Sequence, residues 1–211
     1  MPERQAQEHG WMHATPGTRG YESGVERFIQ ASQTLNFAVT NRDFLPYLPP
    51  LPARVLDLGA GVGQNAAALA RLGYEVVAVE PLGDFVEAAR RTYPGLSIHS
   101  QQDSLPQLES LHDVAPFDFI LLDGVWHHLD PDERPVAMAR IASLMHPGGR
   151  CAISLRNGPA GMGTHLFPTS AAETIRQGAA CGLKAILHLE NQPSLFAHKV
   201  GVSWARVVLE K

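Results

Sequence analysis

The chain has 211 residues, of which 45% are hydrophobic and 18% are charged. This length and composition predict one globular domain with an appended arm, and they exclude an intrinsically disordered chain, a collagen and a disulfide-stapled miniprotein. The formal net charge of −4 gives no electrostatic attraction to nucleic acid, which a basic stripe would provide.

Residues 1–20 are mainly polar and are predicted to form a loose arm. From Tyr21 onward, apolar residues recur at helical intervals and predict one or two helices between about 22 and 48. These helices are expected to end at the prolines of 49–52. We therefore predict an N-terminal arm and helical cap over 1–50 and a main domain over 51–211.

After residue 53, short apolar runs alternate with segments of helical spacing. Strands are predicted at 54–59, 75–79, 96–99, 117–122, 150–155, 183–189 and 201–209. Helices are predicted at 64–72, 84–92, 131–145 and 170–181. Pro131 suits the first turn of the third of these helices. The run Pro147-Gly148-Gly149 is expected to be a stop and a turn before the fifth strand.

This alternation predicts parallel strands with right-handed crossovers, and hence a doubly wound α/β sheet. Between the last two strands, residues 190–200 hold only a loop that contains Pro and Asn. A short link of this kind favours antiparallel pairing of strands six and seven.

The strongest local signal is the run Val55-Leu-Asp-Leu-Gly-Ala-Gly-Val-Gly63, in which a strand meets three glycines and then a helix. Glycine permits a positive φ and removes the Cβ that would block a ligand, and the helix that follows directs free N–H groups at the same place. A dinucleotide site would have the spacing Gly-x-Gly-x-x-Gly, whereas the third glycine here comes one residue early. Asp57 would also repel a diphosphate and attract an ammonium. We therefore expect a ligand with a cationic amino-acid end and a nucleoside end.

Two further carboxylates follow the next strands. Glu80 ends the second strand, where an acidic side chain can accept hydrogen bonds from both ribose hydroxyls. Asp103 lies in the loop after the third strand, where a carboxylate can bind the exocyclic amine of adenine. Ligands of open α/β sheets bind at this edge, so these groups are expected to share one site. A surface cap for Glu80 and an ordinary loop aspartate for Asp103 are the alternatives.

Five segments, in this order, resemble the class I S-adenosylmethionine-dependent methyltransferases. They are Val55–Gly63, Val79–Pro81, Asp103–Pro106, Phe117–Leu122 and Leu144–Gly149. The resemblance covers about residues 50–211 in topology and about 53–156 in motifs. It implies a Rossmann-like seven-stranded sheet of order 3-2-1-4-5-7-6, with strand seven antiparallel. It also implies S-adenosylmethionine as the cofactor and S-adenosylhomocysteine as its product.

The resemblance further implies which residues hold the cofactor. Asp57, Gly59 and Gly61 would hold the methionine end, and Glu80 would hold the ribose. Leu82 would surround the adenine together with the loop after strand three. With their neighbours, the predicted cofactor-binding residues are Asp57, Gly59, Ala60, Gly61, Glu80, Pro81, Leu82, Asp103, Ser104, Asp123 and Gly124.

The fourth strand runs into Leu122-Asp-Gly-Val-Trp-His-His-Leu129, and by the resemblance its end faces the methyl group. The Asn-Pro-Pro-Tyr type of tetrapeptide is absent, which speaks against base-flipping DNA chemistry. His127 and His128 are the candidate catalytic residues, since a histidine can take a proton from a hydroxyl or amine. Proximity and orientation alone can also drive methyl transfer, and a structural role for both histidines is the alternative. Trp126 is expected to pack near the adenine or under this loop, and stacking on the substrate is the alternative.

Residues of three other segments are predicted to contact the substrate. Arg156 ends the fifth strand and could bind an acidic group, the alternative being an ion pair with Asp123 or Glu173. The Gly-rich loop over 157–168 is long enough to act as a lid, and its His165 and Phe167 would line the acceptor pocket. Tyr21 and other aromatic residues of the cap would cover the opposite side or only fill the core.

Other features are expected to carry no chemistry. Cys151 and Cys181 stand among apolar residues, far apart in the sequence, and are expected to be buried thiols in a reducing compartment. No metal site is predicted. No apolar run is long enough to span a bilayer, and the first ten residues lack a secretory signal. The expected location is the cytoplasm.

Taken together, the sequence predicts an enzyme that transfers a methyl group from S-adenosylmethionine to an oxygen or nitrogen of a small molecule. We expect a monomer or homodimer with no nucleic-acid or membrane partner. An RNA- or protein-directed methyltransferase and a non-catalytic cofactor-binding module are the alternatives.

Overall fold

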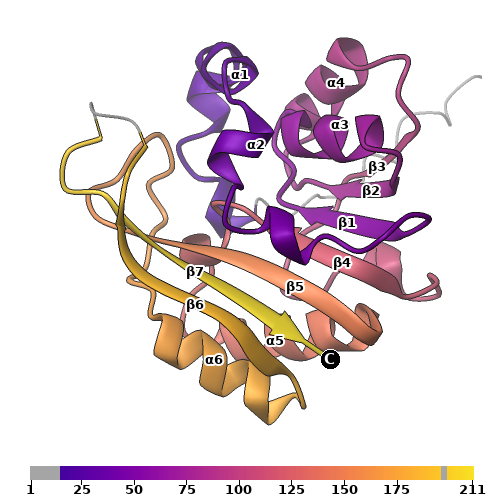
Figure 1. The fold of residues 1–211 in the computed structure, drawn as a ribbon. Coiled ribbons are helices and arrows are strands. Elements are labelled where there is room, and N and C mark those ends of the chain that lie inside the picture. The colour runs from indigo at the N-terminus through magenta and orange to yellow at the C-terminus, as the bar shows by residue number, and fades with distance from the viewer. Residues whose placement is uncertain (1–14, 196–198) are drawn as a thin grey trace, which may run out of the picture.

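Seven strands form a single sheet in a computed structural model that describes residues 15–195 and 199–211. The strand order is β3-β2-β1-β4-β5-β7-β6, as predicted (Figure 1). The strands are β1 (Arg54–Leu58), β2 (Glu75–Val79), β3 (Ile98–Gln101), β4 (Phe117–Leu122), β5 (Met145–Asn157), β6 (Lys184–Pro193) and β7 (Ser203–Glu210). Strands β1 to β5 pair in parallel, whereas β7 is antiparallel to both β5 and β6. The predicted fold is therefore confirmed.

Helices cover both faces of the sheet. In Figure 1, α3 (Gln64–Arg71) and α4 (Gly83–Thr92) lie on one side, and α5 (Glu133–Leu144) and α6 (Ala171–Ala180) lie on the other. The shorter α1 (Val25–Gln33) and α2 (Phe37–Thr40) lie on the side of α3 and α4 and form the cap. Single 3-10 turns occupy Pro16–Thr18, Glu22–Gly24, Leu45–Tyr47, Glu109–Leu111 and Trp126–His128.

The central strands are buried on both faces, because successive side chains of a strand point to opposite sides. In β1, Leu56 and Leu58 belong to the apolar layer that contains Met138 and Ile141 of α5. Val55 belongs to the layer that contains Ala66 and Leu69 of α3. Asp57 alternates with the leucines and so shares the α3 side of the sheet, where the residue is 1% exposed.

Some predicted boundaries are wrong for local reasons. The helix expected from Pro131 begins at Glu133, because Asp130 accepts hydrogen bonds from the N–H groups of Asp132 and Glu133. The glutamate in turn accepts the N–H of Asp130. Residues 147–149, expected to be a turn before the fifth strand, lie inside β5 as an irregularity. There the partner of β4 shifts from Met145 to Arg150.

The cap is more broken than the helical spacing predicts. Residues 22–48 contain one nine-residue helix and one four-residue helix. The break falls at Asn36, whose side chain accepts hydrogen bonds from the N–H groups of Ala38 and Val39 and so starts a new helix. Whether the cap is a separate domain from 51–211 stays a prediction.

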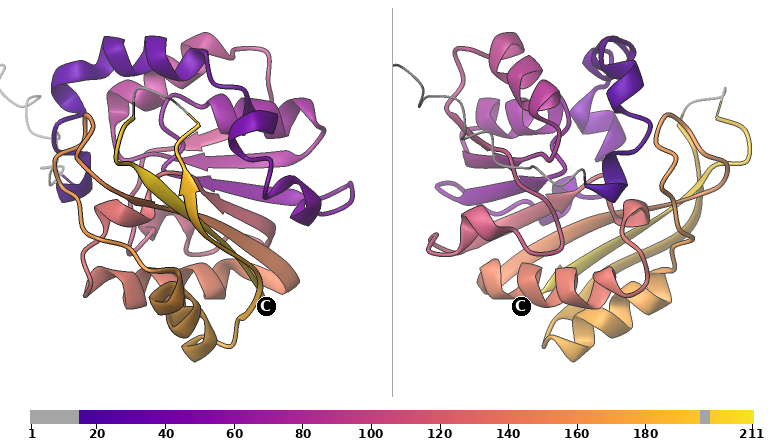
Figure 2. Two further views of the ribbon diagram at one scale, coloured as in Figure 1. Left: turned by 60° about the vertical axis from the view of Figure 1, so that its left-hand side comes forward. Right: turned by 180° about the vertical axis from the view of Figure 1, so that it is seen from behind.

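Two loops meet beyond the end of the sheet. The loop after β5 and the far end of the β6–β7 hairpin lie side by side in Figures 1 and 2. A Cβ added to Gly158 would lie 2.4 Å from the carbonyl oxygen of Gly201, so the two backbones are in direct contact. Within the described part of the chain, no helix has both the length and the apolar character needed to cross a membrane.

Candidate active site

A cavity of about 1420 Å³ lies at the carboxyl ends of the parallel strands. Its walls come from the turns after β1, β2, β3 and β4, from the end of β5, from the cap and from the β6–β7 hairpin. Ligand pockets commonly measure roughly 300–1,000 Å³, so this cavity has room for more than one small molecule.

The glycine turn after β1 presents bare backbone to this cavity. Gly59, Gly61 and Gly63 all have positive φ, at 68°, 55° and 82°. The N–H groups of Gly59 and Ala60 both donate to the carbonyl of Val79, at 2.8 and 3.0 Å. The N–H of Gly63 donates to Ala60. These amides are therefore engaged within the protein and do not form a nest for a diphosphate.

Glu80 lies at the centre of this arrangement. Its side chain is only 7% exposed, and its two oxygens accept the N–H groups of Gly61 and Leu82 at 2.8 and 2.9 Å. Burial raises the pKa of Glu80 to about 7, against the lowering effect of the two backbone hydrogen bonds. The carboxylate therefore fixes the backbone on both sides of the predicted ribose site, where each oxygen retains a further lone pair.

Asp57 lies outside the lining that the described residues give to the cavity. A backbone hydrogen bond from Ala66, in the first turn of α3, stabilises its charged form. Burial, followed by the nearby charge of Asp123, raises the pKa of Asp57 to about 7. Its Oδ2 has no hydrogen-bond partner among residues 15–195 and 199–211. Asp57 is thus held by the backbone of α3, and its direct contact with a ligand stays a prediction.

The other predicted cofactor-binding residues all line the cavity. They are Ala60, Pro81, Leu82, Asp103, Ser104, Asp123 and Gly124. The carboxylate of Asp103 is engaged by its own loop. One oxygen accepts the N–H of Ser104, and the other accepts both the N–H and the hydroxyl of Ser110, each at 2.7 Å. Asp103 therefore shapes the loop, and adenine would have to use its remaining lone pairs.

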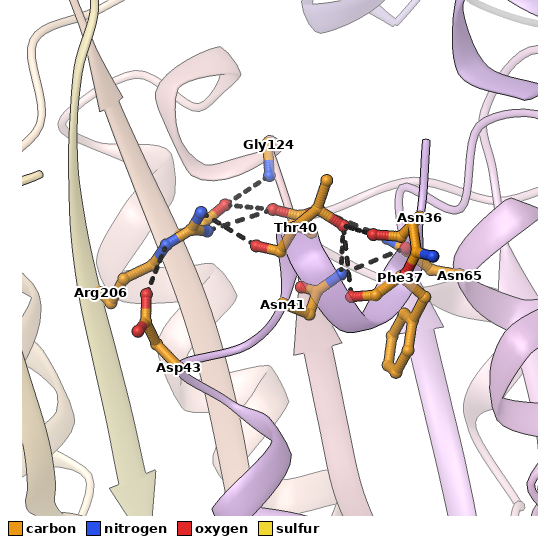
Figure 3. A network of polar contacts seen from close by, with 10 residues as sticks. Asn36, Phe37, Thr40, Asn41, Asp43, Asn65, Gly124 and Arg206 are labelled. Atoms are coloured by element: carbon orange, nitrogen blue, oxygen red, sulfur yellow. Dashed lines mark hydrogen bonds and ion pairs between the residues drawn. The ribbon is translucent and has the colours of Figure 1, made fainter. Parts of the chain in front are cut away.

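Asp123 belongs to a buried polar network that the sequence did not indicate. Arg206 of β7 lies 3.4 Å from Asp123 and 3.9 Å from Asp43, and it donates to the carbonyl of Thr40 at 3.3 Å. Figure 3 shows Arg206 between Asp43 and Thr40 of the cap. The hydroxyl of Ser154 donates to Asp123 at 2.8 Å and accepts the N–H of Gly124 at 2.7 Å. Arg206 therefore joins the cap to the end of β4. Asn65 makes a second link, since it donates to Asp123 at 3.4 Å and accepts from Asn41 of the cap at 3.3 Å.

The two candidate catalytic histidines both line the cavity. Nδ1 of His128 donates to the carbonyl of His165 at 2.9 Å, because a carbonyl oxygen can only accept. Its Nε2 therefore carries the lone pair and accepts the hydroxyl of Tyr21 at 3.1 Å. Burial lowers the pKa of His128, so the ring is neutral at pH 7.

His127 is more deeply buried, at 4% exposure. Burial lowers its pKa well below the usual value, and the neighbouring ring of His128 is the next cause. Its carbonyl accepts the N–H of Phe167 at 2.9 Å, which holds the loop after β5 against this turn.

The predicted substrate residues separate into two groups. Tyr21 and Arg156 line the cavity, whereas His165 and Phe167 are absent from the lining that the described residues form. The rings of His165 and Phe167 pack edge to face at 4.9 Å, and their backbones hold the two histidines instead. Trp126 is fully buried in the core below this turn, as one of the two predicted positions required.

No group of three or more His, Cys, Asp and Glu side chains within the described ranges could hold a metal ion. His9 and His13 lie outside these ranges, as do Trp11 and Met12. Cys151 and Cys181 are both free, Cys151 being fully buried and Cys181 partly so.

The sequence pattern of the protein family described as "Methyltransferase domain" matches residues 55–149. The chain is 33% identical over 104 residues to an uncharacterized methyltransferase of Mycobacterium bovis. The aligned region covers 49% of this chain and 40% of that protein. It is 34% identical over 119 residues to the ubiquinone biosynthesis O-methyltransferase of Xanthomonas axonopodis pv. citri, covering 52% and 46%. The chain thus spans less than half the length of these two relatives.

A similar solved structure is the 1,6-didemethyltoxoflavin-N1-methyltransferase of Burkholderia thailandensis, crystallised with 1,6-didemethyltoxoflavin and S-adenosylhomocysteine bound. The TM-score is 0.72 at 21% identity, over 100% of this chain and 93% of that one. This likeness shows the same fold. The resemblance that the sequence indicated is confirmed.

Proposed function

Because residues 55–149 carry a methyltransferase domain and the chain has the class I methyltransferase fold, we propose that it transfers a methyl group from S-adenosylmethionine to an oxygen or nitrogen of a small molecule. The observation that supports this most is how the N–H groups of the glycine turn are hydrogen-bonded. Its amides are bonded within the protein: the N–H of Gly61, which a dinucleotide enzyme would direct at phosphate, donates to the buried carboxylate of Glu80.

The residues around the turn fit a cationic nucleoside. Glu80 presents carboxylate lone pairs to the two ribose hydroxyls, and the backbone of Gly59 and Gly61, which lines the cavity, contacts the methionine end. Leu82 and the loop of Asp103 and Ser104 form the adenine wall. When bound, S-adenosylmethionine supplies an electrophilic methyl group on its sulfonium. Relatives crystallised with this cofactor or its product share the fold, which supports the same cofactor here.

Tyr21 and His128 are our candidates to receive a proton from the acceptor. The Tyr21 hydroxyl donates to neutral His128, so its oxygen lone pairs are available to an acceptor hydroxyl or amine. Burial, followed by the charge of Glu80, raises the pKa of Tyr21 and keeps the hydroxyl protonated at pH 7. Tyr21 therefore orients the nucleophile, and His128 can take a proton through it.

The segments that border the cavity support a small acceptor. The cap, the loop after β5 and the β6–β7 hairpin border the part of the cavity that contains Tyr21, His128 and Arg156, which we call the reaction end. The net charge of −4 gives no attraction to a polyanion. The names of a ubiquinone-pathway O-methyltransferase and a toxoflavin N1-methyltransferase among similar proteins point to the same acceptor class.

The experiment is a label-partition assay. The protein is incubated with S-adenosylmethionine labelled with tritium in the methyl group, and with a cell extract divided into small molecules, RNA and protein. We expect protein-dependent label in the small-molecule fraction alone, and we expect it to disappear with Glu80→Gln.

Label in RNA or protein would replace the small acceptor with a macromolecule. No label in any fraction, with normal S-adenosylhomocysteine binding, would indicate a non-catalytic binding module.

A further inference from the structure

Arg156 provides a positive charge at the reaction end of the cavity. It stands near the end of β5, in register with Trp204 of β7, and both side chains line the cavity. One N–H of its guanidinium donates to the carbonyl of Pro159 at 2.6 Å, which anchors the half-buried side chain. The remaining donors of a guanidinium suit a carboxylate.

The carboxylates that the sequence offered as partners for Arg156 are held by other arginines. Asp123 lies 3.4 Å from Arg206, and Glu173 lies 3.7 Å from Arg134. No ion pair involving Arg156 occurs within the part of the chain that the structure describes. A half-buried guanidinium without a carboxylate is electrostatically unfavourable, and an anion would relieve this.

A second cation faces the same space from the β6–β7 hairpin. Lys199 lines the cavity, and its pKa is lowered first by burial and then by the positive charge of Arg156, with Asp123 opposing. Burial also lowers the pKa of Arg156, and the Tyr21 hydroxyl is the group that opposes this. Two like charges, one from the end of β5 and one from the connection between β6 and β7, thus face the same cavity, next to the residue that we propose orients the nucleophile.

We infer that the methyl acceptor is an organic acid whose carboxylate binds Arg156, with Lys199 beside it, while its hydroxyl or amine meets Tyr21. This inference rests on the proposed function, because it assigns a substrate class to the same cavity. The apolar wall formed by Trp204 and Val202 favours a flat apolar body between the two polar ends. The acidic end of the cavity would hold the cofactor and repel this carboxylate, which sets the direction in which the acceptor binds.

The test uses three aromatic acids with different distances between hydroxyl and carboxylate, each paired with its neutral primary amide. They are 4-hydroxybenzoate, 4-hydroxyphenylacetate and 4-hydroxycinnamate. Each is titrated calorimetrically into the protein already saturated with S-adenosylhomocysteine. We expect at least one acid to bind tenfold or more tightly than its amide, and we expect Arg156→Gln to bring the two within twofold of each other.

Two further variants separate charge from structure. Arg156→Lys keeps the charge without the planar fork and should retain part of the preference for the acid. Arg176→Gln removes an exposed arginine of α6, outside the cavity, and should leave the preference unchanged.

The outcomes distinguish the two proposals. If the wild type binds S-adenosylhomocysteine but prefers no acid over its amide, the anion inference is wrong and the proposed function stands. The same conclusion follows if Arg156→Gln keeps the full preference. If S-adenosylhomocysteine itself does not bind, the proposed function fails first.

Discussion

Both the backbone conformation and the surroundings of Gly59 make any other residue at this position unfavourable. Its φ is +68°, and a Cβ built on it would lie 2.4 Å from Cγ2 of Val125. Gly182, just after α6, has φ +81° but nothing within 4 Å of the same position. We expect Gly182→Ala to lower the free energy of unfolding by about 1–2 kcal/mol, from the backbone alone. Gly59→Ala should cost about 1–3 kcal/mol more, because Val125 must move.

Urea unfolding of both variants measures this difference. Equal losses in the two variants would show that Val125 adjusts freely, and the turn would then be less constrained than its contacts indicate.

The raised pKa of Glu80 predicts how binding depends on pH. In the unliganded protein this carboxyl has a pKa of about 7, so it is partly protonated at neutral pH. Ribose hydroxyls favour the ionised form, so ligand binding lowers the pKa and expels a proton. The dissociation constant for S-adenosylhomocysteine should therefore rise about tenfold from pH 8 to pH 6 and stay flat above pH 8. A constant affinity across this range, measured by calorimetry, would contradict the assignment of Glu80.

Among the structural elements, the cap depends on Arg206. This side chain is 8% exposed and joins Thr40 and Asp43 of the cap to Asp123 of the site. A lysine has one ammonium in place of the fork and cannot meet all three partners. We expect Arg206→Lys to lower the free energy of unfolding by about 1–3 kcal/mol and to speed hydrogen exchange over residues 37–47.

Arg150→Lys is the matched control for this change. Arg150 also joins a carboxylate, Glu210, to a cap carbonyl, that of Tyr47, but it is more exposed. Its replacement should cost less than about 1 kcal/mol. If Arg150→Lys destabilises the protein as much as Arg206→Lys, the special role of Arg206 is not supported.

The sequence predicted best those elements that consist of one unbroken run of apolar residues. The strand over 75–79 and the strand over 117–122 have the predicted bounds, because each is a short branched apolar run buried on both faces. The cap was predicted less well, since Asn36 interrupts the helical spacing with its own side-chain hydrogen bonds. Residues 147–149 resemble an ordinary turn in sequence. They lie inside β5 between the partners of β4 at Met145 and Arg150, and Gly148 and Gly149 exchange backbone hydrogen bonds with Lys211.

Within the site, too, the contacts that a local sequence pattern indicates could be predicted, and the others could not. The glycine turn and Glu80 are close in sequence and have fixed spacing, so their meeting could be predicted. Arg206 contacts residues 40, 43 and 123, and no local pattern indicates contacts over such separations. A charged residue within the apolar run of the last strand was the one available signal. His165 was predicted from its side chain, whereas its carbonyl makes the contact with His128.

Across the whole molecule, one cavity holds charges of opposite sign at its two ends. Glu80 and Asp103 follow β2 and β3, at the end that we propose for the cofactor, and Arg156 and Lys199 lie at the end beyond β5. Asp123, which also lines the cavity, is paired with Arg206. A cationic cofactor and an anionic acceptor would each be attracted to one end and repelled from the other. The distribution of charge within the cavity is therefore more informative about binding than the net charge of −4.

The central claim is that the corner between Glu80 and the glycine turn binds a nucleoside with an amino-acid end. The most direct measurement is calorimetric titration of S-adenosylhomocysteine and, separately, of NAD into the wild type, Glu80→Gln and Glu75→Gln. Glu75 opens the same strand, and its side chain is 70% exposed.

We predict a single site for S-adenosylhomocysteine with a dissociation constant in the micromolar range and no heat with NAD. Glu80→Gln should weaken binding by tenfold or more, equivalent to about 1.4 kcal/mol, because an amide cannot accept both backbone N–H groups. Glu75→Gln should leave it unchanged. Binding of NAD without binding of S-adenosylhomocysteine would contradict the account.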